Sequence, residues 1–266
     1  MKKALGLLVL VVTLVTSLSA KSLKDLAKGA AKKALGVENQ KEETSEPVAL
    51  TNEIALYSFL KGTNADLTNE YLPYAKTIEN DVWEKYHNDP FEWDEKFAEC
   101  KKNFDNKVKN VNLEQEYVLS TVIELGDFDF ENLGYKVNIP EGTYFPMKKV
   151  STTGSWYDAY PGDDSYFVNN FGLKIQDLTK YNFVPMSKDD GKKFLQSRKN
   201  SYGDINSEVT IFFKYKLASF DSQEYNEFAA AIANEGRIPL VGIIQGSIEV
   251  LDNKNNYAKI GELIIK

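Results

Sequence analysis

The stretch Val209–Tyr215, which reads Val-Thr-Ile-Phe-Phe-Lys-Tyr, decides the fold class of this 266-residue chain. β-Branched and aromatic residues dominate it, and this composition favours an extended strand. A longer apolar run follows at Leu240–Leu251, and after a turn at Asp252–Asn256 the chain returns through Tyr257–Ile265. Strands joined by so short a turn pair antiparallel. The end of the chain therefore predicts an antiparallel sheet.

Shorter extended segments precede this sheet along the chain. Tyr117–Ile123 has the composition of a strand. Two helices are expected between the strands, one at Ser187–Arg198 with Ser187 as its N-cap and one at Tyr225–Asn234. Four further short strands are predicted, at Tyr135–Ile139, Tyr144–Val150, Phe167–Ile175 and Phe183–Met186.

The chain before these strands has helical periodicity. It predicts a short helix around Ile54–Leu60, a second over Thr68–His87 and a third over Phe91–Val108. We therefore expect an α+β fold, with a helical N-terminal portion followed by a mainly antiparallel β-sheet with one or two inserted helices. A single domain would span residues 49–266, helical over 50–110 and mainly β over 114–266.

The first residues of the chain have the layout of a secretory signal peptide. Lys2 and Lys3 are followed by an apolar run, Ala4–Val15, and by small residues up to Ala20. The apolar run is shorter than the roughly 20 residues that cross a bilayer. Residues 1–20 therefore predict export to the periplasm or the exterior, with cleavage near Ala20.

Residues 21–48 have the pattern of a basic amphipathic segment and a flexible linker. Lys21–Val37 places Leu and Ala residues on one helical face and lysines on the other. Two interpretations stay open: weak contact with an anionic membrane surface, or a solvated leader. Gly36–Pro47 is polar and lacks periodicity, so it predicts a linker.

Composition bounds the class of protein. The chain is 42% apolar and 27% charged, with 15 Tyr and 15 Phe, so we expect a sizeable core. Its net charge of −7 argues against nucleic-acid binding, which needs a basic surface. The sequence has no glycine-rich phosphate loop and no other cofactor motif, so no cofactor is expected.

Two single residues, His87 and Cys100, are candidates for chemistry. His87 is the only histidine, and the simpler interpretation places it at a helix C-terminus, where the dipole favours it. Cys100 is the only cysteine, which excludes an internal disulfide. Its spacing with Phe97 and Phe104 predicts a buried apolar position rather than a nucleophile.

Alternating acids define a candidate metal site. Asp127, Asp129 and Glu131 would lie on one face of a strand, and such oxygen ligands suit Ca²⁺. The alternative is a solvated strand face, because the spacing departs from that of a calcium-binding loop.

The segment Gly154–Phe167 is the candidate binding site. It combines several large aromatic residues with Gly, Pro, Asp and Ser, which is typical of a loop that contacts a ligand or partner. The alternative is that the aromatic rings pack down on one end of the sheet. The candidate binding residues are Trp156, Tyr157, Asp158, Tyr160, Asp163 and Asp164.

The run from Phe183–Met186 through Phe194-Leu195 to the strands at Val209–Leu217 and Ile243–Val250 resembles families of exported bacterial proteins of unknown function. The resemblance covers about the last 90 residues and implies compartment and class only. It carries no functional residues over to this chain.

Three functions remain open on this basis. The leading hypothesis is an exported, non-enzymatic binding or cell-envelope protein with an unknown ligand or protein partner. The alternative is a hydrolase of glycans or envelope polymers, which would need two carboxyls about 5–10 Å apart in a cleft. The third is a membrane-associated structural protein that keeps its signal as an anchor.

Overall fold

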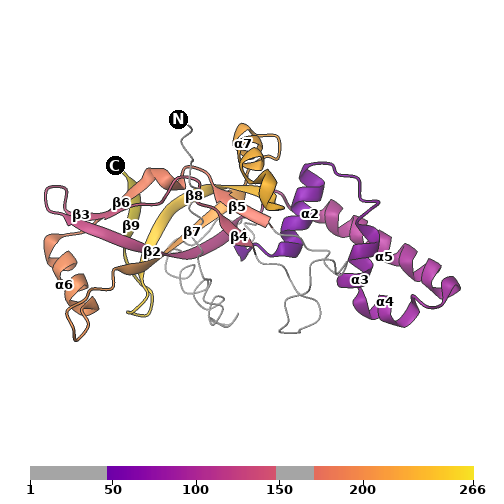
Figure 1. Ribbon diagram of the computed structural model, residues 1–266, viewed down its shortest axis with the longest axis horizontal. Coiled ribbons are helices and arrows are strands. Elements are labelled where there is room, and N and C mark those ends of the chain that lie inside the picture. The colour runs from indigo at the N-terminus through magenta and orange to yellow at the C-terminus, as the bar shows by residue number, and fades with distance from the viewer. Residues whose placement is uncertain (1–46, 148–170) are drawn as a thin grey trace, which may run out of the picture.

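The computed structural model describes residues 47–147 and 171–266, and its helices precede most of its strands (Figure 1). The N-terminal helices are α2 (Asn52–Gly62), α3 (Tyr71–Thr77), α4 (Asn80–Tyr86) and α5 (Pro90–Asn110). The strands are β1 (Val48–Ala49), β2 (Tyr117–Asp129), β3 (Gly134–Val137), β4 (Phe145–Met147), β5 (Phe171–Ile175), β6 (Tyr181–Pro185), β7 (Glu208–Leu217), β8 (Ile238–Asp252) and β9 (Ala258–Ile265). Two helices are inserted among the strands, α6 (Lys188–Arg198) and α7 (Gln223–Ile232).

Six of the strands close into a barrel. The ring runs β2–β3–β6–β9–β8–β7 and back to β2, and every neighbouring pair in it is antiparallel. Strand β5 extends the sheet by pairing parallel to β8, and β4 pairs antiparallel to β5. The predicted α+β fold with a mainly antiparallel sheet is confirmed. The closure of the ring and the parallel β5–β8 pair were not predicted.

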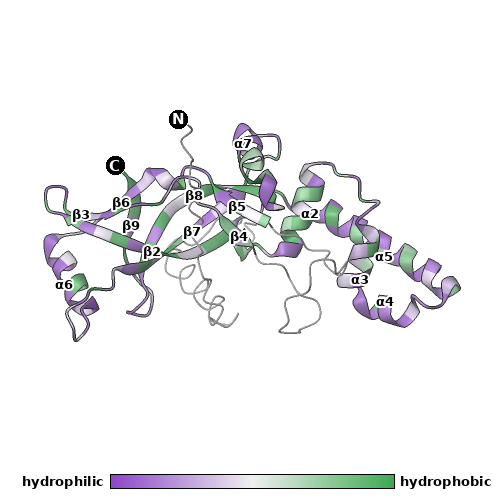
Figure 2. Ribbon diagram, viewed as in Figure 1, coloured by the Kyte–Doolittle hydropathy of each residue, from purple (hydrophilic) through white to green (hydrophobic). Residues whose placement is uncertain are grey.

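Every second residue of β7 faces the barrel interior. Its inward residues Val209, Ile211, Phe213 and Tyr215 are at most 1% exposed. The residues paired with them on β2 complete the same face, because opposite residues in an antiparallel pair point to the same side. These partners are Ile123, Thr121, Leu119 and Tyr117. Figure 2 shows hydrophobic residues on these strands and on α2, whereas α4 and α6 are mostly hydrophilic.

Strand β8 bends, and its two halves pair with different strands. Residues 238–242 pair with β5, and residues 248–252 pair with β9. Between the halves lies Gly246, with a φ of 79°, a left-handed conformation that glycine adopts without steric cost. The opposite strand shows a register shift between Phe212 and Lys214. This bulge and the glycine together allow one strand to belong to the barrel and to its extension.

The helical portion differs from the prediction at one point. The expected single helix Thr68–His87 is two helices, α3 and α4, which break at Ile78-Glu79. The carbonyl oxygen of Tyr74 accepts from the N–H groups of both residues, and the Tyr74 hydroxyl donates to Glu79 Oε1 at 2.9 Å. Pro73 lies inside α3 and does not break it, because a proline is tolerated in the first turn of a helix.

Helix α6 lies at the end of the barrel opposite the N-terminal helices (Figure 1). It begins as predicted, because the Ser187 hydroxyl accepts from the Asp190 N–H at 3.1 Å. Its last residue, Arg198, is fully buried in an ion pair with Asp252 at the β8–β9 turn. The guanidinium also donates to the Glu208 carbonyl oxygen at 2.8 Å, which fixes the start of β7.

Helix α7 packs on the outer face of the sheet extension through a second, smaller cluster of apolar residues. The members of this cluster are Tyr144, Ala218, Phe228, Ile232 and Val241. The main core lies on the other face of the same strands and continues into the N-terminal helices. The extension is therefore covered on both faces, and α7 forms one wall of the site described next.

Candidate functional site

Strand β5 forms the floor of a small pocket under α7. Its residues Phe171, Leu173 and Ile175 are at most 3% exposed and face the main core, so Gly172 and Lys174 between them face α7. A Cβ at Gly172 would lie 3.2 Å from the Tyr144 ring and 3.3 Å from the Ile232 side chain. Glycine at this position therefore lets the strand approach both residues.

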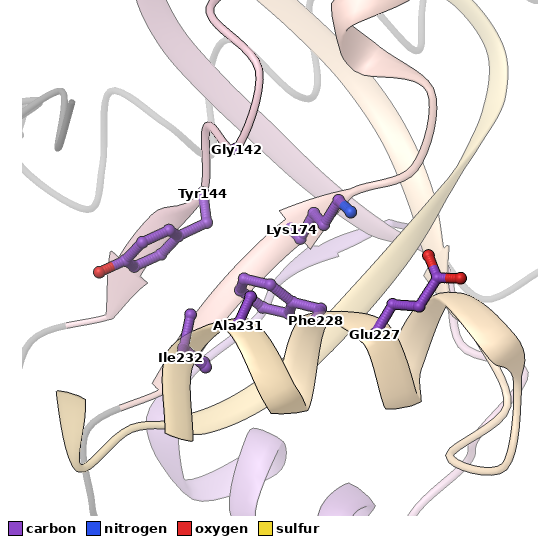
Figure 3. A pocket seen from close by; sticks show the side chains of 7 residues that line it. All are labelled: Gly142, Tyr144, Lys174, Glu227, Phe228, Ala231 and Ile232. Carbon is purple, nitrogen blue, oxygen red and sulfur yellow. The ribbon is translucent and has the colours of Figure 1, made fainter. Parts of the chain in front are cut away.

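The pocket lies between Tyr144 and α7 and has a volume of about 90 Å³ (Figure 3). The rings of Tyr144 and Phe228 pack against each other, with their centroids 5.7 Å apart, and together form part of its apolar lining. Helix α7 presents Phe228 and Ile232 one turn apart, and Ala231 lies exposed at the rim. The lining residues are Gly142, Tyr144, Lys174, Glu227, Phe228, Ala231 and Ile232.

The acidic residues around the pocket are already hydrogen-bonded. Glu227 accepts from Gln223 Nε2 at 2.7 Å, and Glu224 accepts from Gln176 Nε2 at 3.1 Å. The Tyr144 hydroxyl donates to Glu235 Oε2, and Arg237 Nε lies 3.6 Å from the same oxygen. Burial raises the pKa of Tyr144, and the hydrogen bond to Glu235 raises it further, so the hydroxyl stays a donor at neutral pH.

Lys174 is the cationic residue that lines the pocket, and no described residue forms a hydrogen bond or an ion pair with its side chain. Among residues 47–147 and 171–266, its ammonium makes neither an ion pair nor a direct hydrogen bond. Its Nζ lies 5.9 Å from the centroid of the Phe228 ring. The side chain is half-buried and runs along the pocket (Figure 3).

The predicted binding residues Trp156, Tyr157, Asp158, Tyr160, Asp163 and Asp164 lie outside the described residues. The chain is described up to Met147 and again from Phe171, so the strands on either side of this segment are β4 and β5. These two strands, paired with each other, adjoin the pocket. The function of the segment stays a prediction.

The structure does not bring Asp127, Asp129 and Glu131 together as metal ligands. Among the described residues, no three His, Cys, Asp or Glu side chains form a group that could hold a metal ion. A register shift interrupts β2 after Leu125, and the strand ends at Asp129, so Glu131 lies in the turn. Asp129 instead accepts from the N–H groups of Glu131 and Asn132, and its bonds with Asn132 lower its pKa.

His87 and Cys100 lie where the simpler interpretation placed them. His87 is the C-terminal cap residue of α4, where its Nδ1 donates to the Trp83 carbonyl oxygen at 2.6 Å and its ring stacks on Trp83. Cys100 is 2% exposed on the face of α5 that also buries Phe104. Burial raises the pKa of its thiol, which makes it a poor nucleophile at neutral pH.

Sequence reasoning missed the pocket residues, although part of the signal was present. The helix containing Phe228 and Ile232 was predicted, and so was the strand that carries Gly172 and Lys174. What the sequence did not reveal is that β5 pairs parallel to β8, which brings this strand under α7. A non-local pairing of this kind leaves no local pattern in the chain.

Comparison with known protein families places part of the chain in a described family. Residues 66–197 match the family described as a domain of unknown function (DUF4852). The matched region runs from before α3 to α6, and so includes β2 to β6 but neither β7 nor α7. It overlaps the resemblance to exported proteins of unknown function only at Phe183–Met186 and Phe194-Leu195. Searches of curated proteins and of solved structures find no significant match.

Within the two described ranges, no helix has both the length and the apolar character to cross a membrane.

Proposed function

We propose that this chain is an exported, non-enzymatic binding protein of the cell envelope that holds an apolar group of its ligand between Tyr144 and α7. The observation that carries the proposal is the pocket, whose walls are the Tyr144 ring, Phe228 and Ile232. An apolar cavity of about 150 Å³ binds benzene. A pocket of about 90 Å³ therefore suits a smaller group, such as a branched four-carbon side chain.

The expected affinity follows from the size of that group. Burying one CH₂ group contributes about 0.8 kcal/mol, so four carbons contribute about 3 kcal/mol. A millimolar dissociation constant corresponds to about 4 kcal/mol. The pocket alone should therefore bind a small probe in the millimolar range, and contacts outside it would add to this affinity.

The chemistry of the pocket favours binding over hydrolysis. Glu227 is the one carboxylate among its lining residues. Hydrolysis of a glycan by two acids needs a second carboxyl about 5–10 Å away in the same cleft. The nearby acids Glu224 and Glu235 do not line the pocket and are hydrogen-bonded to Gln176 and Tyr144. Export is supported by the N-terminal sequence, in which Lys2 and Lys3 precede the apolar run Ala4–Val15.

The test is a titration of the full chain with N-acetyl-L-leucine amide, followed by NMR chemical shifts. Ala231→Leu should fill the pocket and weaken binding at least about tenfold, since it places an aliphatic group where the probe would lie. Ala230→Leu is the matched control, because Ala230 is also exposed on α7 but does not line the pocket. Equal binding by both variants, or no binding by the unaltered chain, would overturn the proposal.

A further inference from the structure

The charged residues at the rim of the pocket indicate which chemical group of the ligand lies next to its apolar group. Lys174 and Glu227 are its two charged lining residues. Glu227 accepts a hydrogen bond from Gln223, and Glu224 and Glu235 next to the pocket are also hydrogen-bonded. The ammonium of Lys174 has no counterpart of this kind in the described parts of the chain. Of the two charged lining residues, Lys174 is therefore the one whose charged group has no hydrogen-bond partner among residues 47–147 and 171–266.

Lys174 is placed so that a ligand in the pocket can contact its ammonium group. Because it alternates with Leu173 and Ile175, which face the core, its side chain is directed to the α7 side of β5. The ammonium lies near the Phe228 ring, which is itself a wall of the pocket. A group in the pocket that touches the Tyr144 and Phe228 rings would thus also have the Lys174 side chain as a neighbour, because all three residues line the pocket.

We infer that the ligand of this pocket is an apolar group that carries a carboxylate, which Lys174 receives at the rim. The inference rests on the proposed binding function and names its ligand class. A half-buried ammonium has lost part of its hydration, and an anion compensates this loss better than a neutral acceptor. Hydrogen bonds between charged groups are also roughly twice as strong as neutral ones.

Two sources supply this chemistry. One is the C-terminal residue of a polypeptide with an apolar side chain, and the other is a free short-chain fatty acid. They differ in the N–H that precedes the carboxylate in a peptide. Glu227 is the lining residue that could accept it, so a peptide C-terminus would engage both charged residues, whereas a fatty acid would engage Lys174 alone.

Three probes of the full chain test the inference: N-acetyl-L-leucine, its amide, and 4-methylpentanoate. The unaltered chain should bind the two carboxylates about tenfold more tightly than the amide. Lys174→Met keeps the length of the side chain but removes its charge, so it should abolish this difference, and the acid and the amide should bind the variant with equal affinity. Lys192→Met, an exposed lysine of α6 remote from the pocket, should keep the difference. Thermal melting checks that each variant is folded.

The outcomes separate the inference from the proposed function. If N-acetyl-L-leucine and its amide bind equally tightly and Ala231→Leu weakens the binding of both, the proposed pocket is supported. The inference that the ligand carries a carboxylate is then wrong. If the difference survives Lys174→Met, the inference is also overturned. If none of the probes binds, both the proposed function and this inference are overturned. Tighter binding of N-acetyl-L-leucine than of 4-methylpentanoate would identify a peptide C-terminus, and equal binding would identify the fatty acid.

Discussion

At the scale of single residues, the buried ion pair between Arg198 and Asp252 is a feature whose loss should cost much stability. The Arg198 side chain is fully buried and that of Asp252 is 8% exposed. Asp252 also accepts from the N–H groups of Lys254 and Asn255, so it holds the β8–β9 turn as well. A buried charge without its partner is expensive because neither water nor a counterion replaces the lost interaction.

Removing the cation should therefore destabilise the protein severely. We expect Arg198→Met to lower the free energy of unfolding by about 3–5 kcal/mol, measured by urea denaturation. The double variant Arg198→Met with Asp252→Asn should recover part of the loss, because the amide keeps an acceptor for the turn and leaves no charge buried. A loss under about 1 kcal/mol for the single variant would contradict this account.

A second residue, Glu53 on α2, should make stability depend on pH. Burial alone would raise the pKa of Glu53, but hydrogen bonds from the Tyr57 hydroxyl at 2.6 Å and from Lys107 Nζ at 3.0 Å outweigh burial and lower it. A carboxyl with a lowered pKa in the folded state stabilises the fold above its unfolded pKa of about 4.3. This contribution disappears as the pH falls through the folded pKa.

The corresponding variant is Glu53→Gln. Its urea midpoint should lie below that of the unaltered chain near pH 6, and the gap should close as the pH falls below about 4.3 and through the lowered folded-state pKa of Glu53. Glu84→Gln, which alters an exposed glutamate of α4, is the control and should show no such closing gap. A gap that stays constant down to pH 3 would show that the charge of Glu53 is not the cause.

At the scale of elements, α2 and α7 meet through one aromatic ring. Phe220 lies in the loop before α7, packs edge-on against Phe59 of α2 and contacts Tyr225 in the first turn of α7. A Cβ at Gly62 would lie 2.1 Å from the Phe220 ring. The glycine at the end of α2 thus allows the N-terminal helices to approach the loop that leads to the pocket.

Gly62→Ala should consequently behave against the usual trend. Alanine in place of a helical glycine normally stabilises by up to about 1 kcal/mol. Here the added methyl group must displace a packed ring, so we expect a loss of about 1–3 kcal/mol in urea denaturation. Combining it with Phe220→Leu should cost less than the sum of the two single variants, because the leucine removes the clashing atoms. Additive losses would show that the ring is not the obstacle.

The elements also show where sequence reasoning succeeds and where it fails. Local signals located α2, α5, the Ser187 cap of α6 and the strands β7 and β8, because propensity and capping act within a few residues. They did not reveal the break at Ile78-Glu79, which depends on the buried side chain of Tyr74. The pocket stayed hidden for the same reason, since it depends on β5 reaching β8 from far along the sequence.

At the scale of the whole molecule, the described fold begins at its first short strand. Val48-Ala49 of β1 pairs parallel to Tyr117-Val118 of β2. The preceding segment Gly36–Pro47 is polar and has little to bury. We expect a chain that starts at Pro47 to melt within a few degrees of one that starts at Lys21, as measured by calorimetry. A large drop in melting temperature would show that Lys21–Val37 packs on the fold.

Closure of the barrel has a consequence for self-association. Six strands of the sheet have both neighbours within the ring, so in the described residues the ends of the strand order fall on β1 and β4. These strands are two and three residues long, and β4 contains Pro146, which has no N–H to offer to another chain. Exposed strand edges are the templates on which β-proteins aggregate. By ending in two such short edges, the strand order offers a neighbouring molecule little backbone to pair with at its two ends.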